Sequence, residues 1–352
     1  MRVVVIGATG NIGTSTVRAL AADPGVESVL GLARRPASLP VDKAEWATAD
    51  VRETDLVPLL RGADAVVHLA WLFQPTHDPV VTWRNNVLGS ERVFDAVARA
   101  GVPALVYSSS VGAYSPVPPA DKGAPVTEDW PTHARPTAAY GREKAYVERL
   151  LDVFERDHPD RRVVRMRPGF VFQRSAASGQ RRLFAGPLLP NPLVRPGLLP
   201  VVPDIPGLRF QVLHARDAGE AFRLAVTRDV RGAFNLGADP VIGVPELARL
   251  LDARPVPVPA RAARAALGAA WRLRLVPASP GLLDLALHVP VMDVARARGE
   301  LGWSPRHSAF EALEDFLSGL REGAGADTPP LSPRTSGPAR LRELLTGVGR
   351  RP

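Results

Sequence analysis

Short apolar runs alternate with helical patterns over the first 168 residues of the chain. The apolar runs occupy residues 3–6, 29–32, 65–69, 104–108 and 163–166, with a shorter one near Trp46. Between them, apolar residues recur with helical spacing over residues 11–22, 81–100 and 137–156. Strands that alternate with helices in this way are typical of βαβ units. The pattern therefore predicts an α/β fold with a doubly wound parallel sheet.

The pattern changes after Pro168. Residues 186–207 combine many prolines with apolar residues, which excludes a regular helix or a central strand and predicts an irregular lid or wall. Helical patterns return near residues 217–227, 245–252 and 260–274. We expect residues 169–321 to form mainly a smaller domain over the carboxyl ends of the strands, where open α/β sheets bind ligands. The glycines and prolines of residues 322–352 predict a disordered tail with one short helix around 339–345.

Composition excludes several classes of function. The 352 residues include no Cys, so the chain has no disulfide framework and no thiolate nucleophile or metal ligand. The histidines lack metal-ligand spacing, and we predict no metal site. No apolar run is long enough to span a membrane and the start lacks a signal-peptide layout, so we expect a cytoplasmic protein without a membrane partner. The net charge of +8 comes from scattered arginines, and we expect no nucleic-acid partner.

A glycine motif follows the first predicted strand. Residues 3–13 read VVVIGATGNIG, in which Gly7, Gly10 and Gly13 are spaced three apart. Glycines at this point allow a tight turn, and the N-terminus of the following helix favours a pyrophosphate. The motif predicts a dinucleotide site in residues 1–168, although the spacing alone also suits a plain glycine-rich turn.

Tyr140 and Lys144 are spaced four residues apart on the helix predicted after the long proline-rich loop. The chain has only 4 Tyr and 3 Lys, so the pair is rare by chance. Positions i and i+4 share one helix face, which brings the ammonium near the phenol and favours the ionised phenol. The pair predicts a tyrosine that acts as acid or base, and the alternative is an exposed helix pair.

Serines end the predicted strand at residues 104–108. The segment 107–114 reads YSSSVGAY, which places hydroxyls at the carboxyl edge of the sheet. We expect Ser110 to bond a substrate oxygen, whereas Ser108 faces the cofactor or the backbone. Taken alone, such a run is also typical of a simple turn.

Together these motifs resemble the extended short-chain dehydrogenase/reductase superfamily, which includes NAD(P)-dependent epimerases and dehydratases. The resemblance covers residues 1–320. Smaller matches fall in the same order as in the family, and they are Asp50-Val51, His68-Leu69-Ala70, Asn86-Val87-Leu88-Gly89-Ser90, His214-Ala-Arg-Asp217 and Leu301-Gly-Trp-Ser-Pro305. The resemblance implies a Rossmann domain at 1–168 and a smaller, partly interleaved C-terminal substrate domain at 169–321.

The resemblance also implies roles for individual residues. Tyr140 would be the general acid/base, Lys144 would hold the nicotinamide ribose and lower the pKa of the phenol, and Ser110 would position the reacting oxygen. These two, Tyr140 and Lys144, would also contact the cofactor. The remaining cofactor contacts would come from Gly7, Gly10, Asn11, Ile12, Gly13, Arg34, Asp50, Val51, Leu69, Ala70, Ser108 and Pro168.

Two departures from the family pattern bear on the ligands. Where NAD-dependent members carry Asp after the second strand, this chain has Ala33, Arg34 and Arg35, which predicts NADP, with NAD possible, because guanidinium groups suit a 2′-phosphate. In an Arg-rich chain the two arginines can also be without meaning.

The second departure concerns the substrate. Nucleotide-sugar enzymes of the family follow the Arg of the sixth strand with an Asn three residues on and a Gly after that, and here Arg167 is followed by Phe170 and Gln173. Several apolar side chains flank the expected pocket, although each also suits core packing, and they are Trp71, Leu72, Phe73, Phe170, Phe172, Leu183 and Phe184. The opposing observation is a set of arginines that suits a diphosphate, Arg174, Arg181 and Arg182.

The sequence thus predicts an NAD(P)-dependent oxidoreductase that acts on a carbonyl or alcohol of a small, partly apolar molecule. The alternatives are a nucleotide-sugar epimerase or dehydratase, and a dinucleotide-binding sensor without turnover, against which the intact Tyr140 and Lys144 argue. The expected partner is the small-molecule substrate, and a homodimer is left open.

Overall fold

A seven-stranded parallel sheet forms the centre of the larger domain. The computed structural model describes residues 1–350 except 36, 38, 119, 120, 122, 192–194 and 196. The strands follow the order β10-β6-β5-β4-β1-β2-β3, and every pairing is parallel. They are β1 (Arg2–Ile6), β2 (Ser28–Ala33), β3 (Ala44–Thr48), β4 (Ala65–His68), β5 (Ala104–Ser108), β6 (Arg162–Pro168) and β10 (Gly232–Leu236).

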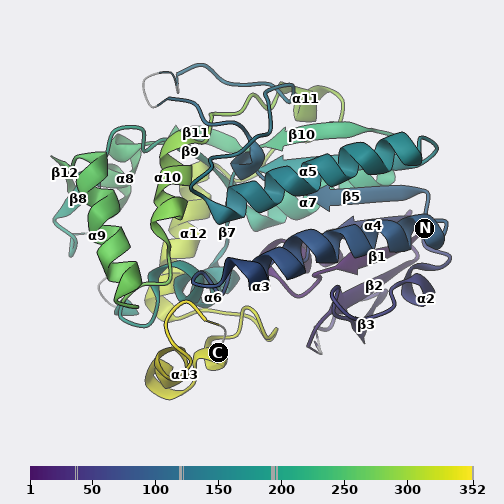
Figure 1. The fold of residues 1–352 in the computed structure, drawn as a ribbon, viewed down its shortest axis with the longest axis horizontal. Coiled ribbons are helices and arrows are strands. Elements are labelled where there is room, and N and C mark those ends of the chain that lie inside the picture. The colour runs from purple at the N-terminus through teal and green to yellow at the C-terminus, as the bar shows by residue number, and fades with distance from the viewer. Residues whose placement is uncertain are drawn as a thin grey trace.

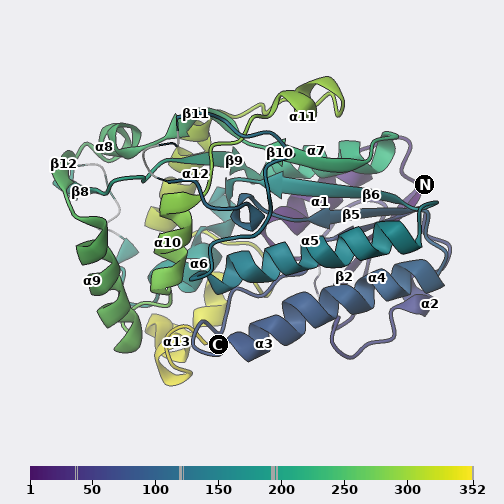
Figure 2. The same cartoon turned by 45° about the horizontal axis from the view of Figure 1, so that its top comes forward.

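Helices cover both faces of this sheet (Figures 1 and 2). On β1, Val3 and Val5 pack in one buried cluster with α1 (Asn11–Ala21) and α7 (Ala215–Thr227). Val4 and Ile6 point the opposite way and join a second cluster, because neighbouring side chains on a strand face opposite sides. The helices of that cluster are α2 (Val57–Leu60), α4 (Gly89–Arg99) and α5 (Ala139–Asp157).

The helix predicted for residues 81–100 is interrupted. It consists of α3 (Pro79–Trp83), a π-helical turn at Arg84–Leu88 and α4. A π-turn inserts an extra residue into the helix, and such turns are frequent at functional sites. Here it buries the side chains of Asn85 and Asn86 beneath the loop that follows β4.

The second domain is built on a three-stranded sheet of order β11-β9-β7, with β7 (Phe170–Phe172), β9 (Phe210–His214) and β11 (Ala238–Ile242). A two-stranded sheet pairs β8 (Val201–Asp204) with β12 (Arg254–Pro257). The helices are α6 (Ala177–Gln180), α8 (Val244–Leu251), α9 (Ala260–Arg272), α10 (Pro280–His288), α11 (Ala295–Gly299) and α12 (Ala309–Glu322). Because β10 and α7 return to the first domain, the predicted α/β class with an interleaved second domain is confirmed.

The described residues of the proline-rich stretch at 186–207 contain no α-helix, and β8 lies within the stretch at Val201–Asp204. Residues 192–194 and 196 of this stretch lie outside the described residues. In the part of the chain that the structure describes, no helix has the length and apolar character needed to cross a bilayer.

The C-terminal segment, residues 324–350, differs from the disordered tail that the composition suggests. It contains short helical turns at Pro333–Ser336 and Pro338–Arg340 and the helix α13 (Leu341–Leu345). The segment packs back on both domains through buried polar contacts, including a hydrogen bond from Thr328 Oγ1 to Thr9 O of 2.9 Å. Proline and glycine content is a local property, and it cannot reveal contacts made with residues more than 150 positions away.

Candidate active site

The turn between β1 and α1 requires glycine at two positions. Gly7 has a φ of +89°, and a Cβ there would lie 2.6 Å from the backbone nitrogen of Ala70. A Cβ on Gly13 would lie 2.3 Å from the carbonyl oxygen of Gly7. Any side chain at either position would push α1 and the β4 loop away from the turn, so glycine keeps the backbone open at this edge of the sheet.

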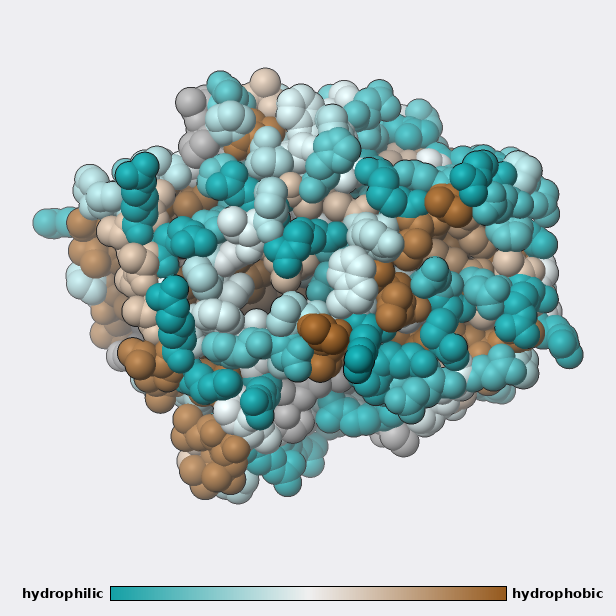
Figure 3. All heavy atoms as spheres, in the orientation of Figure 1, coloured by the Kyte–Doolittle hydropathy of each residue, from teal (hydrophilic) through white to brown (hydrophobic). Residues whose placement is uncertain are grey.

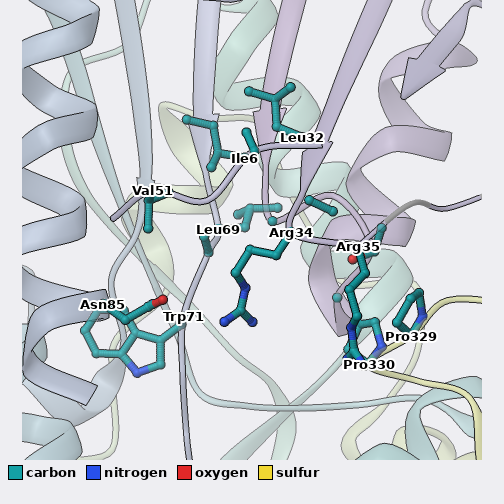
Figure 4. Close-up of a pocket in the computed structure, with 16 residues that line it drawn as sticks. Ile6, Leu32, Arg34, Arg35, Val51, Leu69, Trp71, Asn85, Pro329 and Pro330 are labelled. Carbon is teal, nitrogen blue, oxygen red and sulfur yellow. The ribbon is translucent and has the colours of Figure 1, made fainter. Parts of the chain in front are cut away.

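A cleft opens in front of this turn, at the N-terminus of α1. Gly10 caps the helix without a side-chain hydrogen bond, so side chains leave the first backbone N–H groups free for an anion. The cleft lies at the carboxyl ends of β1, β2 and β4 (Figure 4). Its lining consists of Ile6, Gly7, Thr9, Gly10, Leu32, Ala33, Arg34, Arg35, Ala49, Val51, Leu69, Ala70, Trp71, Asn85, Pro329 and Pro330.

Arg34 extends its guanidinium into the cleft (Figure 4). Partial burial lowers the pKa of Arg34, the carboxylate of Asp50 counteracts this, and Arg35 adds to the lowering. Asp50 itself is bound by Arg52, whose hydrogen bond lowers the pKa of the Asp50 carboxyl. Arg34 thus lies in the cleft near the positive charges of Arg35 and Arg52, which makes this part of the cleft suitable for an anionic group.

The predicted cofactor residues fall into two groups. Six line the cleft, namely Gly7, Gly10, Arg34, Val51, Leu69 and Ala70. The others do not line it, namely Asn11, Ile12, Gly13, Asp50, Ser108, Tyr140, Lys144 and Pro168.

The side chain of Asn11 is tied to the second domain. Its Nδ2 donates to Val171 O at 2.9 Å, and its Oδ1 accepts from Gln173 Nε2 at 2.9 Å. The side-chain amide of Asn11 is therefore engaged with the second domain and does not point into the cleft. Gln173, at one of the positions where the chain departs from the family pattern, holds the start of α1 against β7.

Pro329 and Pro330 line the cleft although no local sequence signal suggested them. They lie next to Thr328, whose hydroxyl binds the carbonyl of Thr9 in the glycine turn. The guanidinium of Arg182 donates to the carbonyl of Pro330 at 2.5 Å. The C-terminal segment thus forms one wall of the cleft.

Asn85 also lines the cleft and was not predicted. A sequence signal for it existed, because Asn85 directly precedes the recognised motif that starts at Asn86.

Ser110, Tyr140 and Lys144 come together where β5 ends and α5 begins. Ser110 Oγ accepts a hydrogen bond from Gly112 N at 3.0 Å and is hydrogen-bonded to the phenol of Tyr140. Lys144 Nζ donates to Ser108 O at 2.6 Å. Glycine at position 141 allows this approach, because a Cβ there would lie 2.8 Å from the Gly112 carbonyl oxygen. The predicted catalytic set is therefore close together in space.

The protonation states differ from the prediction. Burial raises the pKa of Tyr140 to about 12, against a smaller lowering by the hydrogen bond with Ser110, and the charge of Glu143 raises it further. The prediction that Lys144 lowers the pKa of the phenol is wrong for this structure. The ammonium lies instead 3.5 Å from the centroid of the Trp71 ring, and burial lowers the pKa of Lys144 well below its usual value.

Aromatic rings surround the Tyr140 phenol. The ring of Phe73 stacks on Tyr140 with centroids 5.2 Å apart and planes 10° from parallel, and Trp71 meets it edge-on at 5.8 Å. Phe184 contacts Phe73 edge-on at 5.7 Å. A small pocket beside Tyr140 is lined by Leu72, Phe73, Pro75, Thr76, Pro79, Thr82, Ala139, Glu143, Ser279 and Leu282. Figure 3 shows the surface hollowed near the N-terminal end of α5.

Only part of the predicted apolar wall faces this pocket. Phe170 packs against Phe210 at 5.1 Å and against a buried cluster that includes Val111 and Tyr114, whereas Phe172 packs against Phe316 at 4.8 Å inside the second domain. Core packing therefore explains these two rings.

The three arginines that suited a diphosphate are all engaged. Arg174 pairs with Glu322, Arg181 with Glu343, and Arg182 with the carbonyls of Pro330 and Ser332. Their partners lie in α12 and the C-terminal segment, so none of the three guanidinium groups is free to bind a phosphate as the structure stands.

A buried network of Glu148, Arg165 and Arg167 contacts the serine segment. Glu148, one helical turn after Lys144, accepts hydrogen bonds from Ser109 Oγ at 2.5 Å and from Arg167 at 3.0 Å. Burial alone would raise the pKa of Glu148, but Arg167 and Arg165 lower it to about 2. Glu148 is therefore a carboxylate at neutral pH, and it fixes the end of β5 where Ser110 stands.

Comparison with known proteins agrees with these motifs. The family model for the NAD dependent epimerase/dehydratase family matches residues 3–237. The chain belongs to this family. Membership confirms the predicted superfamily and the prediction that the protein is an enzyme. The matched residues include the glycine turn, Ser110, Tyr140 and Lys144.

Individual relatives are distant. An uncharacterized protein of Mycobacterium tuberculosis is 26% identical over 289 residues, which is 79% of this chain and 72% of the relative. A UDP-glucose 4-epimerase of Neisseria meningitidis serogroup B is 26% identical over 346 residues, covering 89% of this chain and 95% of the relative.

Solved structures of other proteins share the fold. UDP-glucose 4-epimerase from Stenotrophomonas maltophila, with bound NAD and formylated UDP-arabinopyranose, superposes with a TM-score of 0.68 at 24% identity, covering 92% of this chain and 98% of that one. MoeE5 in complex with UDP-glucuronic acid and NAD gives a TM-score of 0.64 at 23% identity, covering 92% and 100%.

Proposed function

We propose that the protein is an NAD(P)-dependent epimerase or dehydratase of nucleotide sugars. The observation that carries the proposal is the family match together with Ser110, Tyr140 and Lys144 gathered at the carboxyl end of β5. Relatives of similar length and fold include UDP-glucose 4-epimerases. These comparisons favour what was the alternative in the sequence analysis over its main prediction, an oxidoreductase for a small apolar molecule.

The site residues fit a dinucleotide. The glycine turn leaves a cradle that a Cβ at Gly7 would fill, and α1 begins directly after Gly10, which lines the same cleft. A bound nicotinamide dinucleotide supplies a hydride acceptor that can return the hydride later. Tyr140 would exchange a proton with the substrate oxygen, and Ser110 would hold that oxygen. The phenol is protonated at neutral pH in this structure, so Tyr140 is ready to donate.

We assign NADP as the preferred cofactor. Ala33 lies where an acidic side chain would bind the ribose 2′-hydroxyl, and Arg34 reaches into the same cleft. Asp50 is neutralised by Arg52. The local charge thus favours a 2′-phosphate over a free hydroxyl, whereas the solved relatives named above contain NAD.

A second candidate, an oxidoreductase for an uncharged and partly apolar carbonyl compound, has its own support. Trp71 and Phe73 pack on Tyr140, and Arg174, Arg181 and Arg182 are engaged elsewhere. A nucleotide diphosphate would need other partners, or release of these arginines from theirs.

The two candidates differ in whether the reduced cofactor is consumed. An epimerase or dehydratase returns the hydride, so the absorbance of the dinucleotide is unchanged at the end while NMR shows a new sugar. An oxidoreductase consumes NADPH in proportion to product. The assay pairs NADPH and NADP⁺ with UDP, dTDP and GDP sugars and with aromatic ketones, steroids and long-chain aldehydes, after a thermal-shift screen. Stoichiometric NADPH consumption with a ketone and no change in any sugar would overturn the first proposal.

A further inference from the structure

A buried carboxyl group lies one helical turn from Tyr140. Glu143 is 3% exposed and lines the small pocket beside the phenol. The hydroxyl of Thr82 donates to Glu143 Oε1 at 2.6 Å, and Asn86 Nδ2 donates to Glu143 Oε2 at 2.6 Å. Each carboxyl oxygen is therefore held by one side chain of the α3 and π-turn segment, across the gap between two helices.

Asn86 passes this constraint to the loop after β4. Its Nδ2 also donates to Leu72 O at 2.8 Å, and its Oδ1 accepts from Leu72 N at 2.7 Å. The Asn86 amide is thus hydrogen-bonded to both the backbone N–H and the backbone carbonyl of Leu72, and Asn86 is completely buried. Glu143 and the Leu72 backbone together fix which way the amide faces, because a flipped Asn86 would present its nitrogen to Leu72 N and its oxygen to Leu72 O and the carboxyl group.

The two neighbours of Leu72 contact the catalytic pair. Trp71 lies over the ammonium of Lys144 at 3.5 Å, and Phe73 stacks on the ring of Tyr140 at 5.2 Å. Fixing the Leu72 backbone therefore fixes both rings. The sequence of contacts runs from Glu143 through Asn86 and Leu72 to the surroundings of the proton donor.

We propose that Glu143 is a positioning residue, which orients Asn86 and so holds Trp71 and Phe73 against Lys144 and Tyr140. The proposal rests on the proposed function only in taking Lys144 and Tyr140 as the reacting pair. Glu143 belongs to neither the glycine turn nor the serine segment. It lies between Tyr140 and Lys144 in the sequence, but it is neither of the two residues that define that motif.

The hydrogen-bond pattern identifies glutamine as the matched replacement. The Thr82 hydroxyl has one hydrogen but two acceptors, Glu143 Oε1 and Pro79 O at 3.1 Å. A Gln amide fits this arrangement, because its Nε2 can donate to Thr82 while Thr82 donates to Pro79, and its Oε1 can accept from Asn86. Burial raises the pKa of Glu143, whereas the hydrogen bonds from Thr82 and Asn86 and the charges of Lys144 and Arg142 lower it. Gln also has nearly the same shape as Glu.

The first test needs no ligand. Trp71 emission is isolated by subtracting the fluorescence of Trp71→Phe from that of its parent, in the wild type and in the Glu143→Gln and Glu143→Ala backgrounds. We expect Glu143→Gln to keep the Trp71 emission and its acrylamide quenching, whereas Glu143→Ala shifts the emission to the red and raises quenching at least twofold. Unchanged Trp71 emission in Glu143→Ala, or a Gln variant that behaves like Ala, would overturn the proposal.

A second pair of variants keeps the test decisive if Glu143→Ala does not fold. Thr82→Val removes one hydrogen bond to the carboxyl group and Thr82→Ser retains it, so only Thr82→Val should change Trp71 quenching. NADPH titration then extends the test, and we expect the Kd to rise about tenfold in Glu143→Ala and to stay within about twofold in Glu143→Gln. If the wild type binds neither NADPH nor NADH, the proposed function fails, while the Trp71 comparison still decides the role of Glu143.

Discussion

The guanidinium of Arg181 and the carboxylate of Glu343 form an ion pair in which each side chain is only 4% exposed. Arg181 also donates to Gly186 O and Ser336 Oγ, so its polar hydrogens are shared between the turn after α6 and the C-terminal segment. This pair anchors the segment that carries Pro329 and Pro330 into the cleft in front of the glycine turn. It therefore links the stability of the segment to the shape of the cofactor site.

Glu343→Ala should lower the free energy of unfolding by about 3–5 kcal/mol, because it leaves a buried guanidinium without its charge partner. It should also speed dissociation of NADPH, because the wall at Pro330 is released. The matched control is Glu322→Ala, which breaks the exposed pair with Arg174 and should cost about 0–1 kcal/mol. Urea unfolding and stopped-flow NADPH release measure the two effects, and equal losses in both variants would contradict the anchoring role.

Tyr140→Phe should reduce turnover by about 10²- to 10⁴-fold, because it removes the proton carrier while keeping the ring that stacks on Phe73. NADPH affinity should stay close to that of the wild type. Tyr146→Phe, which alters an exposed phenol on the same helix, serves as the control and should keep full activity. Lys144→Ala should impair both turnover and NADPH binding. Retained turnover in Tyr140→Phe would show that another group carries the proton.

Arg34→Asp should weaken NADPH binding and leave NADH binding nearly unchanged, since it replaces a guanidinium in the cleft with a carboxylate that repels a 2′-phosphate. Arg156→Asp changes the net charge equally at an exposed site on α5 and should alter neither affinity. Nicotinamide fluorescence titration gives both dissociation constants. Tighter binding of NADH than of NADPH by the wild type would refute the assignment of NADP.

The sequence was sufficient for features whose signal is local. The apolar runs predict the strands, and the spacing of Gly7 and Gly10 and that of Tyr140 and Lys144 predict the edge of the sheet where the site forms. In each case neighbouring residues serve one element, so periodicity and spacing report on it directly.

The features that could not be predicted depend on residues far apart in the chain. The C-terminal segment is ordered by pairs such as Thr328 with Thr9, and its prolines looked like those of a free tail. The same segment removes Arg182 from the set of phosphate ligands. The direction of the Lys144 ammonium depends on Trp71, which comes from a different strand end. A charge four residues from a phenol does not by itself lower its pKa when both groups are buried.

His68 makes the stability of the fold depend on pH in the mildly acidic range. Its ring is 1% exposed on β4, with Nε2 at 2.9 Å from Ser90 Oγ, and Nδ1 has no hydrogen-bond partner among the described residues. Burial, with a smaller contribution from the charge of Lys144, lowers the pKa of His68 to about 3.

Because the pKa of His68 is lower in the folded state than in the unfolded state, protonation favours unfolding. The stabilisation is complete above about pH 6.5, the value of an unperturbed histidine, and is lost as the pH falls toward about 3. With one proton the slope is about 1.4 kcal/mol per pH unit, so the loss between about pH 6.5 and 5 is about 2 kcal/mol. Glu148 contributes little in this window, because its stabilisation is lost mainly as the pH falls from the unfolded pKa of about 4.3 toward its folded pKa of about 2.

We therefore expect the free energy of unfolding, measured with urea at about pH 7.5 and pH 5, to fall less for His68→Asn than for the wild type, by about 2 kcal/mol. The variant starts from a lower stability because it loses packing against Phe94 and Tyr107, so the comparison is between the two pH differences and not between absolute values. His133→Asn, which alters an exposed histidine, should keep the pH dependence of the wild type. An identical fall in His68→Asn and the wild type would show that the buried ring is not the group that takes up the proton.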